Sequence, residues 1–502
     1  MTSFFGATFV RLTVREYGNR PRQTDKESVA AVQMVVAPVP ADLLEAVQTQ
    51  CIAGVVRLYA AYNLSGDAVD NDGNNALHLA VKTNNVLLVR TVLLLFDRKY
   101  KLSKKRNNKG KKPIDMTNNN DLRKSFEIIE GTVMPGSEKQ RSIKYEMEKN
   151  VNQQCMKNTL ENQEGKMSVL LSLDGGGIRG IVHILILMAL ERKLPNPVTT
   201  YFDWIAGTST GAIVALALSM GKSLEEILRI YLKLKSEIFT QTRPYNVKNY
   251  ETYLKESLGA GKRMSEIKSH KIIITSCLSN IAPPRLKLFR NYQPNLDAKD
   301  LKDFEYDDPE SVYCWKAARA SSAAPTYFAP FENIYCDGGI MANNPTTEIL
   351  TEFHRFKNIQ EHAGEAPPPP IGCVLSLGTG ITPPIAISSK GRANDLLKLI
   401  SKTTEQIKNM TMVFIKQLTA SDGLPVERSQ TWSHSMGVPF FRFSPPLTQK
   451  VELDESRDVF IMQLMWDVEN YLAIECADEI DELVKYLQTL RTNEKEQCDN
   501  SA

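Results

Sequence analysis

The 502-residue sequence lacks the features of a secreted or membrane-spanning protein. Its eight cysteines form no C-x-x-C pair and no metal-ligand spacing, and the missing disulfide pattern favours a reducing compartment. The longest apolar run, residues 181–190, is about half as long as a membrane span and contains His183. The N-terminus has no continuous apolar stretch, so we expect no secretory signal. Cytoplasmic residence is expected, with a mitochondrial presequence in the arginine-containing N-terminus as the weaker alternative.

The sequence also lacks a strong charge of either sign. Its formal net charge is +3, with 24% charged and 42% hydrophobic residues, which is ordinary globular composition. A nucleic-acid-binding protein is expected to be far more basic, so we expect no nucleic-acid partner. The chain is longer than one compact domain usually is, and two or three domains are expected.

The pattern along the chain changes several times. Residues 72–80 (DGNNALHLA) look like the turn and first helix of an ankyrin repeat, and residues 109–115 give a weaker echo. From residue 167, short apolar runs alternate with helical patterns, which indicates a mostly parallel sheet covered on both faces. We predict a flexible leader, two to three ankyrin-like repeats, a linker, an α/β domain and a polar tail, at 1–38, 39–125, 126–166, 167–490 and 491–502.

Residues 207–211 read Gly-Thr-Ser-Thr-Gly and fit the pattern G-x-S-x-G between a predicted strand and a predicted helix. This is the context of a nucleophile elbow, in which the glycines permit a strained turn and close packing. Ser209 would then expose its hydroxyl at a helix N-terminus, where the helix dipole favours developing negative charge. The pattern is common by itself, and an ordinary strand-to-helix turn is the alternative.

Residues 174–180 read Asp-Gly-Gly-Gly-Ile-Arg-Gly and also connect a predicted strand to a predicted helix. Consecutive glycines leave backbone N–H groups bare and form a nest for an anion. The run fits the dinucleotide pattern G-x-G-x-x-G, but the acidic residue expected about 20 positions later, at a strand end, is missing. Glu191 lies near that distance on a helix, and no Walker-type lysine follows. We therefore favour an oxyanion hole, which a catalytic serine requires.

A catalytic serine also needs a proton acceptor. None of the histidines, at positions 78, 183, 270, 354, 362 and 434, ends a predicted strand, so a Ser-His-Asp triad is unsupported. Asp337 is the better candidate, because it ends a strand-like run and precedes Gly338 and Gly339. Burial would raise its pKa and make it a useful base. A turn aspartate before glycines is the alternative.

The three motifs, in this order, resemble those of the patatin-like phospholipases. Further stretches strengthen the resemblance, at 315–328 (WKAARASSAAPTYF), 341–345 (MANNP) and 375–380 (LSLGTG). It covers about residues 168–385 and, more loosely, the rest of the C-terminal half. Ankyrin repeats before such a domain look like the calcium-independent phospholipase A2 group of animals, although this chain has far fewer repeats than the larger members.

The resemblance implies a three-layer α/β domain with a mostly parallel central sheet, preceded by a short α-helical ankyrin-repeat region. It assigns Ser209 as nucleophile and Asp337 as proton acceptor. The oxyanion hole would consist of the N–H groups of Gly176, Gly177 and Ile178. Arg179 would orient the glycine loop or meet a lipid phosphate. Supporting positions in the motifs are Gly175, Gly180, Gly207, Gly211, Gly338 and Gly339. The family uses no metal or other cofactor in catalysis, so none is expected.

The expected function is calcium-independent hydrolysis of glycerophospholipid acyl esters at a membrane surface. A broader acyl hydrolase or acyltransferase acting on lysophospholipids, glycerides or acyl-CoA shares every catalytic residue. A non-enzymatic ankyrin scaffold is the third hypothesis. The repeats predict a protein partner, and homo-oligomerisation stays open. The apolar spacing of 393–418, with its lysines, predicts a helix suited to calmodulin or a membrane surface, or else a core or solvated helix.

Overall fold

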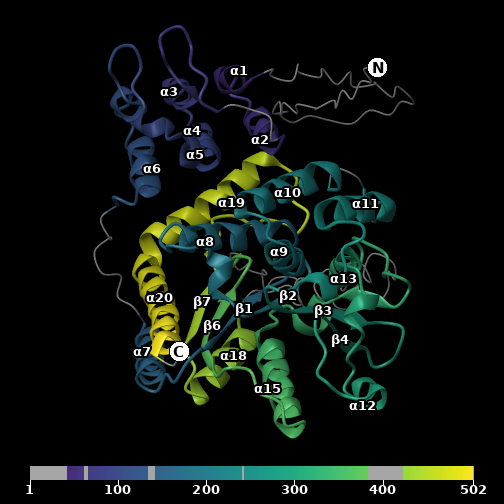
Figure 1. The fold of residues 1–502 in the computed structure, drawn as a ribbon. Helices are drawn as coiled ribbons and strands as arrows, with labels where there is room; N and C mark the ends of the chain where they lie inside the picture. The colour runs from purple at the N-terminus through teal and green to yellow at the C-terminus, as the bar shows by residue number, and fades with distance from the viewer. Residues whose placement is uncertain (1–41, 62–65, 134–141, 240–241, 383–421, 501–502) are drawn as a thin grey trace, which may run out of the picture. The chain divides into compact units, whose positions relative to one another are not determined.

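A computed structural model describes residues 42–61, 66–133, 142–239, 242–382 and 422–500 (Figure 1). The chain divides into two compact units, residues 1–117 and 118–502. The predicted leader, 1–38, and the predicted helix, 393–418, lie outside the described residues. Among the residues that are described, no helix combines the length and hydrophobicity needed to cross a bilayer.

The described part of the first unit is helical. Its principal helices are α1 (Leu43–Gln48), α2 (Ile52–Ala60), α3 (Ala76–Lys82) and α4 (Val86–Val92). The turn before α3 is tied to a later turn, because the Asn107 side-chain amide donates to Asn74 Oδ1 at 2.9 Å. In the same way His78 Nε2 lies 2.9 Å from the Lys111 carbonyl oxygen. Both pairs are 33 residues apart, about the period of an ankyrin unit, so they support the repeat assignment, which stays a prediction.

The second unit contains a seven-stranded sheet in the order β4-β3-β2-β1-β6-β7, with β5 paired to β3. The strands are β1 (Ser168–Leu173), β2 (Trp204–Thr208), β3 (Lys271–Leu278), β4 (Arg285–Arg290), β5 (Tyr335–Asp337), β6 (Ile371–Leu377) and β7 (Phe440–Phe443). All pairs are parallel except β3 with β4 and β3 with β5. This confirms the predicted mostly parallel sheet, to which the sequence pattern had not assigned β4 and β7.

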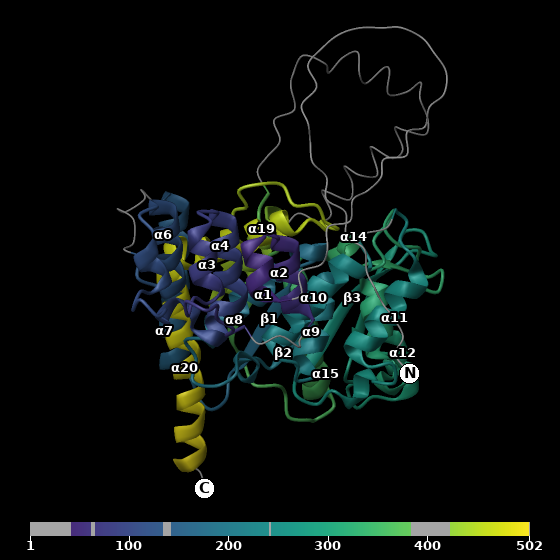
Figure 2. The same cartoon turned by 90° about the horizontal axis from the view of Figure 1, so that it is seen from above.

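Helices cover both faces of the sheet, which makes three layers (Figures 1 and 2). Helices α8 (Ile181–Glu191), α9 (Thr210–Ser219), α10 (Leu224–Glu237) and α19 (Asp458–Asn470) lie on one side. Helices α15 (Thr346–His362), α18 (Leu424–Ser435) and α7 (Ile143–Glu161) lie on the other. Every residue of β1, β2 and β6 is buried, as expected for parallel strands covered on both faces.

The observed elements add detail at three of the predicted segments. The first unit ends at Thr117, so α6 (Asn120–Glu130) belongs to the second unit and contacts α19. Much of the expected linker is the helix α7. α20 (Ala477–Asn500) continues into the expected tail, 491–502, as far as Asn500, and the domain bounds stay predictions. Arg491 explains the extension, since its guanidinium lies 2.8 Å from the Asp203 carboxylate and 3.2 Å from Glu494.

A buried ion pair joins the antiparallel edge of the sheet to α15. Glu352 is fully buried, and its carboxylate accepts two hydrogen bonds from Arg290, at 2.7 and 2.9 Å. The Tyr306 and Tyr292 hydroxyls donate to the same carboxylate, at 2.7 and 3.1 Å. Four donors therefore satisfy one buried charge and fix α15 against β4.

Glu352→Gln is expected to lower the free energy of unfolding by about 3–5 kcal/mol, because it leaves the buried Arg290 charge unpaired. Differential scanning calorimetry measures this as a lower melting temperature. Glu361→Gln is the control on the same helix, since its 3.7 Å contact with Lys357 is half-exposed and worth about 0.5 kcal/mol. Equal melting temperatures for both variants would contradict this role of the ion pair.

Candidate active site

The predicted nucleophile elbow is present between β2 and α9. Ser209 has φ 52° and ψ −113°, a left-handed conformation that non-glycine residues adopt only under strain. Gly207 and Gly211 make this turn sterically possible. A Cβ on Gly207 would lie 2.4 Å from the Gly211 carbonyl oxygen, and one on Gly211 would lie 2.2 Å from that of Leu173. The turn from β2 to α9 therefore requires glycine at positions 207 and 211.

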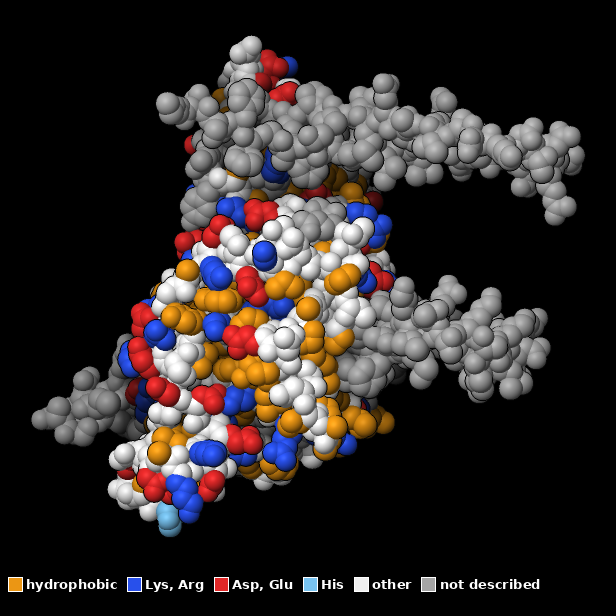
Figure 3. All heavy atoms as spheres, turned by 90° about the vertical axis from the view of Figure 1, so that its right-hand side faces the viewer, with side chains coloured by type: hydrophobic (Ala, Val, Ile, Leu, Met, Phe, Trp, Pro, Cys, Tyr) orange, Lys and Arg blue, Asp and Glu red, His pale blue; other side chains and the backbone are white. Residues whose placement is uncertain are grey.

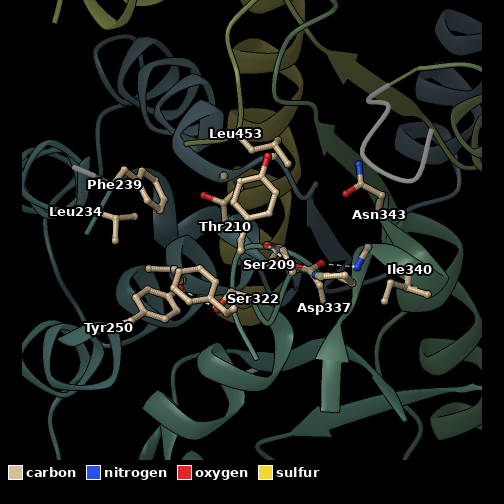
Figure 4. A pocket seen from close by; sticks show the side chains of 18 residues that line it. Ser209, Thr210, Leu234, Phe239, Tyr250, Ser322, Asp337, Ile340, Asn343 and Leu453 are labelled. Atoms are coloured by element: carbon tan, nitrogen blue, oxygen red, sulfur yellow. Dashed lines mark hydrogen bonds between the residues drawn. The ribbon is translucent and has the colours of Figure 1, made fainter. Parts of the chain in front are cut away.

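Ser209 and Asp337 are in direct contact. The Ser209 hydroxyl donates to Asp337 Oδ2 at 2.8 Å, and Figure 4 shows the two side chains next to each other. Asp337 ends the short strand β5, and its other oxygen, Oδ1, accepts the Gly339 N–H at 2.7 Å. A Cβ on Gly338 would lie 2.6 Å from the Thr275 carbonyl oxygen, so glycine lets β5 approach β3. The structure thus unites two residues that are 128 positions apart.

Burial gives Asp337 the properties of a base. The residue is 7% exposed, and burial raises the pKa of its carboxyl to about 6, although its hydrogen bonds from Gly339 and Ser209 act in the opposite direction. A carboxylate with this pKa is ionised at neutral pH and has a higher proton affinity than an exposed aspartate. It can therefore accept a proton from a serine that it contacts directly.

Ser321, at the end of α13 (Cys314–Ser321), bonds to the segments of both Ser209 and Asp337. Its Oγ accepts the Ser209 N–H at 2.7 Å, and its carbonyl oxygen accepts the Gly338 N–H at 3.0 Å. Sequence reasoning placed Ser321 in a stretch that resembles the family but gave it no role. The only available signal was its place in that stretch, because serine is common in ordinary turns.

The glycine loop lies beside Ser209. Gly176 and Gly177 line the same pocket as Ser209, and neither N–H donates a hydrogen bond within the described part of the chain. Both are therefore available to an oxyanion. The predicted third donor, Ile178, is not available, since its N–H donates to the Leu453 carbonyl oxygen at 2.7 Å. The prediction of Ile178 as an oxyanion donor is therefore corrected. Its N–H is bonded to a residue 275 positions away, and no local sequence pattern indicates that contact.

A buried ion pair anchors this loop to the far edge of the sheet. Asp174 is fully buried and accepts two hydrogen bonds from the Arg442 guanidinium on β7, at 2.6 and 3.1 Å. Arg442 was missed, because nothing local in Phe440–Phe443 indicates such a partner. Arg179 is 6% exposed, and its Nε lies 3.4 Å from the Gly176 carbonyl oxygen. Its position favours orientation of the loop over contact with a lipid phosphate.

The pocket above the dyad is mostly apolar. Its walls come from α9, α10, α11 (Val247–Leu258), the segment after α13, α14 (Gly339–Ala342) and the connection between β7 and α19. Apolar and aromatic side chains in the lining are Ile213, Leu234, Phe239, Tyr250, Tyr327, Phe328, Ile340 and Leu453. No histidine lines it, and His183, in α8, is fully buried with its pKa lowered to about 3 by burial. The geometry is that of a Ser–Asp pair facing an apolar pocket.

Comparison with known proteins agrees with this geometry. Residues 171–350 match the family model of the patatin-like phospholipases, and this segment contains the glycine loop, the elbow and Asp337. The chain contains a patatin-like phospholipase domain. Its α/β architecture with a mostly parallel central sheet is the one expected from the sequence.

Relatives of the patatin-like phospholipase domain occur in animals and bacteria. An intracellular phospholipase A2 of Caenorhabditis elegans is 38% identical over 322 residues, 64% of this chain and 29% of that protein. An 85/88 kDa calcium-independent phospholipase A2 of Rattus norvegicus is 35% identical over 332 residues, 63% of this chain and 40% of that protein. A cGAMP-activated phospholipase of Vibrio cholerae is 31% identical over 216 residues. The chain thus spans less than half the length of the two animal relatives.

The reactivity of Ser209 is expected to follow the ionisation of Asp337. Below about pH 6 the carboxyl is protonated and cannot accept the serine proton, so the rate of Ser209 phosphonylation by a fluorophosphonate should fall about tenfold per pH unit. Above pH 6 it should reach a plateau. Intact-protein mass spectrometry after timed quenching measures the rate.

Asp337→Asn is the control, because it keeps the size of the side chain and removes the titration. Its phosphonylation should be slow, and the rate should not fall as the pH is lowered below 6. A wild-type rate that does not change between about pH 5 and pH 8 would contradict the assignment of Asp337 as base.

Proposed function

We propose that this protein is a calcium-independent phospholipase A2-type acyl hydrolase that cleaves fatty acyl esters of glycerophospholipids. The carrying observation is the 2.8 Å contact between Ser209 Oγ and the buried Asp337 carboxylate, beside free N–H groups of the glycine loop. The names of the animal relatives support phospholipids as the substrate class.

Acylation begins when the Ser209 hydroxyl attacks the ester carbonyl carbon and transfers its proton to Asp337. The carbonyl oxygen becomes an oxyanion, which the Gly176 and Gly177 N–H groups stabilise together with the N-terminal end of α9. The tetrahedral intermediate then expels the lysophospholipid alkoxide. That leaving group takes the proton from Asp337, and the acyl chain stays on Ser209 as an ester.

Deacylation repeats these steps with water. Asp337, ionised again, accepts a proton from a water molecule that attacks the acyl-enzyme carbonyl. The second oxyanion accepts hydrogen bonds from the same two N–H groups, those of Gly176 and Gly177. Its collapse releases the fatty acid and returns the proton to Ser209, so that no metal or organic cofactor is needed in the proposed cycle.

The pocket favours esters whose acyl group is an alkyl chain. Its apolar lining suits an alkyl chain, whereas a charged head group would have to remain outside it. A broader acyl hydrolase or an acyltransferase would use the same residues with another leaving group or acceptor. The intact dyad argues against the scaffold hypothesis, because a scaffold needs no serine in a strained conformation.

We further propose that the protein acts in the cytoplasm, on the surface of a membrane. The mixed face in Figure 3 supports this, since hydrophobic side chains gather there among Lys, Arg, Asp and Glu. Ile281, Phe304 and, next to the pocket-lining Ile340, Met341 are 42–43% exposed. Such side chains can enter the lipid interface. A protein partner for the ankyrin-like unit, calmodulin, homo-oligomerisation and the mitochondrial alternative remain predictions from the sequence.

Fatty-acid release from mixed phospholipid vesicles in excess EGTA tests this proposal. Wild type should release fatty acid, whereas Ser209→Ala should lose at least about 10³-fold in rate, because nucleophile and base act as one unit. Asp337→Ala should lose a similar amount. Liquid chromatography with mass spectrometry identifies the products.

Ser435→Ala, an exposed serine on α18, and Asp300→Asn, an exposed aspartate on α12 (Ala298–Asp303), serve as controls and should retain full activity. Activity that survives in Ser209→Ala would overturn the mechanism. Hydrolysis of glycerides or lysophospholipids without that of diacyl phospholipids would keep the dyad and change the substrate class.

A further inference from the structure

One wall of the pocket is formed by a segment far from the catalytic motifs in sequence. Between β7 and α19, residues 452–457, here called the strap, lie beside the glycine loop. Leu453 places its side chain in the pocket, opposite the dyad in Figure 4, and its carbonyl oxygen accepts the Ile178 N–H at 2.7 Å. A Cβ on Gly177 would lie 2.1 Å from that oxygen, so the approach depends on glycine.

Both flanks of the strap are firmly held. On one side the Thr448 N–H and hydroxyl donate to the Asp467 carboxylate, at 2.8 and 2.9 Å, and Val451 is buried. On the other side Asp458 forms a buried 2.6 Å ion pair with Lys235. The strap is therefore a short bridge between fixed ends, whose own position depends on what its middle contacts.

The middle of the strap is held by an ion pair, here called the latch. The Arg243 guanidinium donates to both carboxylate oxygens of Asp454, one at 2.6 Å, and the Tyr245 hydroxyl donates to the same carboxylate. The guanidinium also lies 4.2 Å from the centre of the Tyr327 ring, which lines the pocket. The latch thus joins two walls of the pocket, Tyr327 and Leu453, through charges outside the apolar lining.

The pocket beside the latch is small. Its volume is about 60 Å³, room for roughly four to six water-sized groups. This is enough for the carbonyl group and the first methylenes of one acyl chain. Because Tyr327 and Leu453 both line this space, a shift of the strap relative to Tyr327 would change which acyl groups fit beside Ser209.

We propose that Arg243 and Asp454 are specificity-determining positioning residues, which hold Leu453 against the pocket and select slender acyl groups. A diacyl phospholipid carries a second chain next to the ester that is cleaved, so the latched protein should cleave both lipids but lysophospholipids relatively faster. Opening the latch withdraws Leu453 and should raise the relative rate for the wider substrate. Neither residue touches the reacting atoms, so the latch changes selection between substrates rather than the chemistry.

The first arm of the test rests on the proposed function and uses lysophosphatidylcholine and diacyl phosphatidylcholine in matched mixed micelles. Arg243→Ala and Asp454→Asn should raise the diacyl-to-lyso ratio of kcat/KM by about three- to tenfold, as expected for a half-buried ion pair. Tyr245→Phe removes one donor and should shift the ratio less. Arg243→Lys keeps the charge but cannot donate to both carboxylate oxygens at once, so its ratio should lie between those of wild type and Arg243→Ala.

The second arm does not depend on phospholipids. p-Nitrophenyl octanoate and p-nitrophenyl 2-propylpentanoate are isomers that differ in the width of the acyl group. The branched-to-linear ratio of kcat/KM should rise in the same variants and in the same order. Melting temperatures confirm that each variant is folded.

Arg263→Ala is the matched control. Arg263 also lies over a tyrosine ring, 4.4 Å from Tyr313, pairs with Glu310 at 3.6 Å, and has the same 33% exposed side chain as Arg243, but contacts neither strap nor pocket. Both ratios should remain at the wild-type value in this variant.

The outcomes separate the two proposals. Unchanged ester ratios in folded latch variants would overturn the latch, whatever the lipids show. Ester hydrolysis with the predicted shift, but without fatty-acid release from either lipid by wild type, would overturn the phospholipase assignment and keep the latch. If wild type hydrolyses neither ester, the diacyl-to-lyso ratio decides the latch, and the absence of fatty-acid release from both lipids as well would overturn both proposals.

Discussion

The hydrogen bond between Ser209 and Asp337 is the constraint that organises the domain. It requires a serine at the end of β2 to meet a buried aspartate at the end of β5. The sheet provides this because β2 and β5 pair with consecutive parts of β3: Thr208 lies opposite Thr275, and Asp337 lies opposite the next residue, Ser276. Ser321 then fixes the separation by bonding to both segments. In the proposed mechanism, burial raises the pKa of Asp337 and lets its carboxylate take the role that histidine has in an ordinary triad.

A second constraint is placement of the glycine loop over this dyad. The consecutive glycines have no side chains that could pack and hold the loop, so contacts with other segments fix its position. Arg442 holds Asp174 at its start, and Leu453 holds Ile178 at its end. Two N–H groups, those of Gly176 and Gly177, remain for the oxyanion. Leu453, whose carbonyl oxygen accepts the Ile178 N–H, also lines the pocket, so one short segment contacts both the glycine loop and the proposed acyl site.

The features that were predictable from sequence are local ones. The glycine motifs, the elbow and the strand-ending aspartate each depend on a few consecutive residues and on the steric limits of glycine and of strand ends. The missed features depend on distant pairing: Arg442 with Asp174, Ser321 with Ser209, and Leu453 with Ile178. β4 and β7 were missed because Arg285–Arg290 and Phe440–Phe443 are short and carry arginines, which weaken the apolar pattern. α20 extends into the predicted tail because Arg491 gains partners that only the folded chain supplies.

Trapping the acyl-enzyme tests the central claim most directly. Wild-type protein is mixed with phospholipid, quenched with acid during turnover and digested, and the peptides are analysed by mass spectrometry. The account predicts a fatty acyl adduct on Ser209, absent from Ser209→Ala and strongly reduced in Asp337→Asn. Turnover with the adduct on another residue, or an undiminished adduct in Asp337→Asn, would contradict the Ser209–Asp337 dyad.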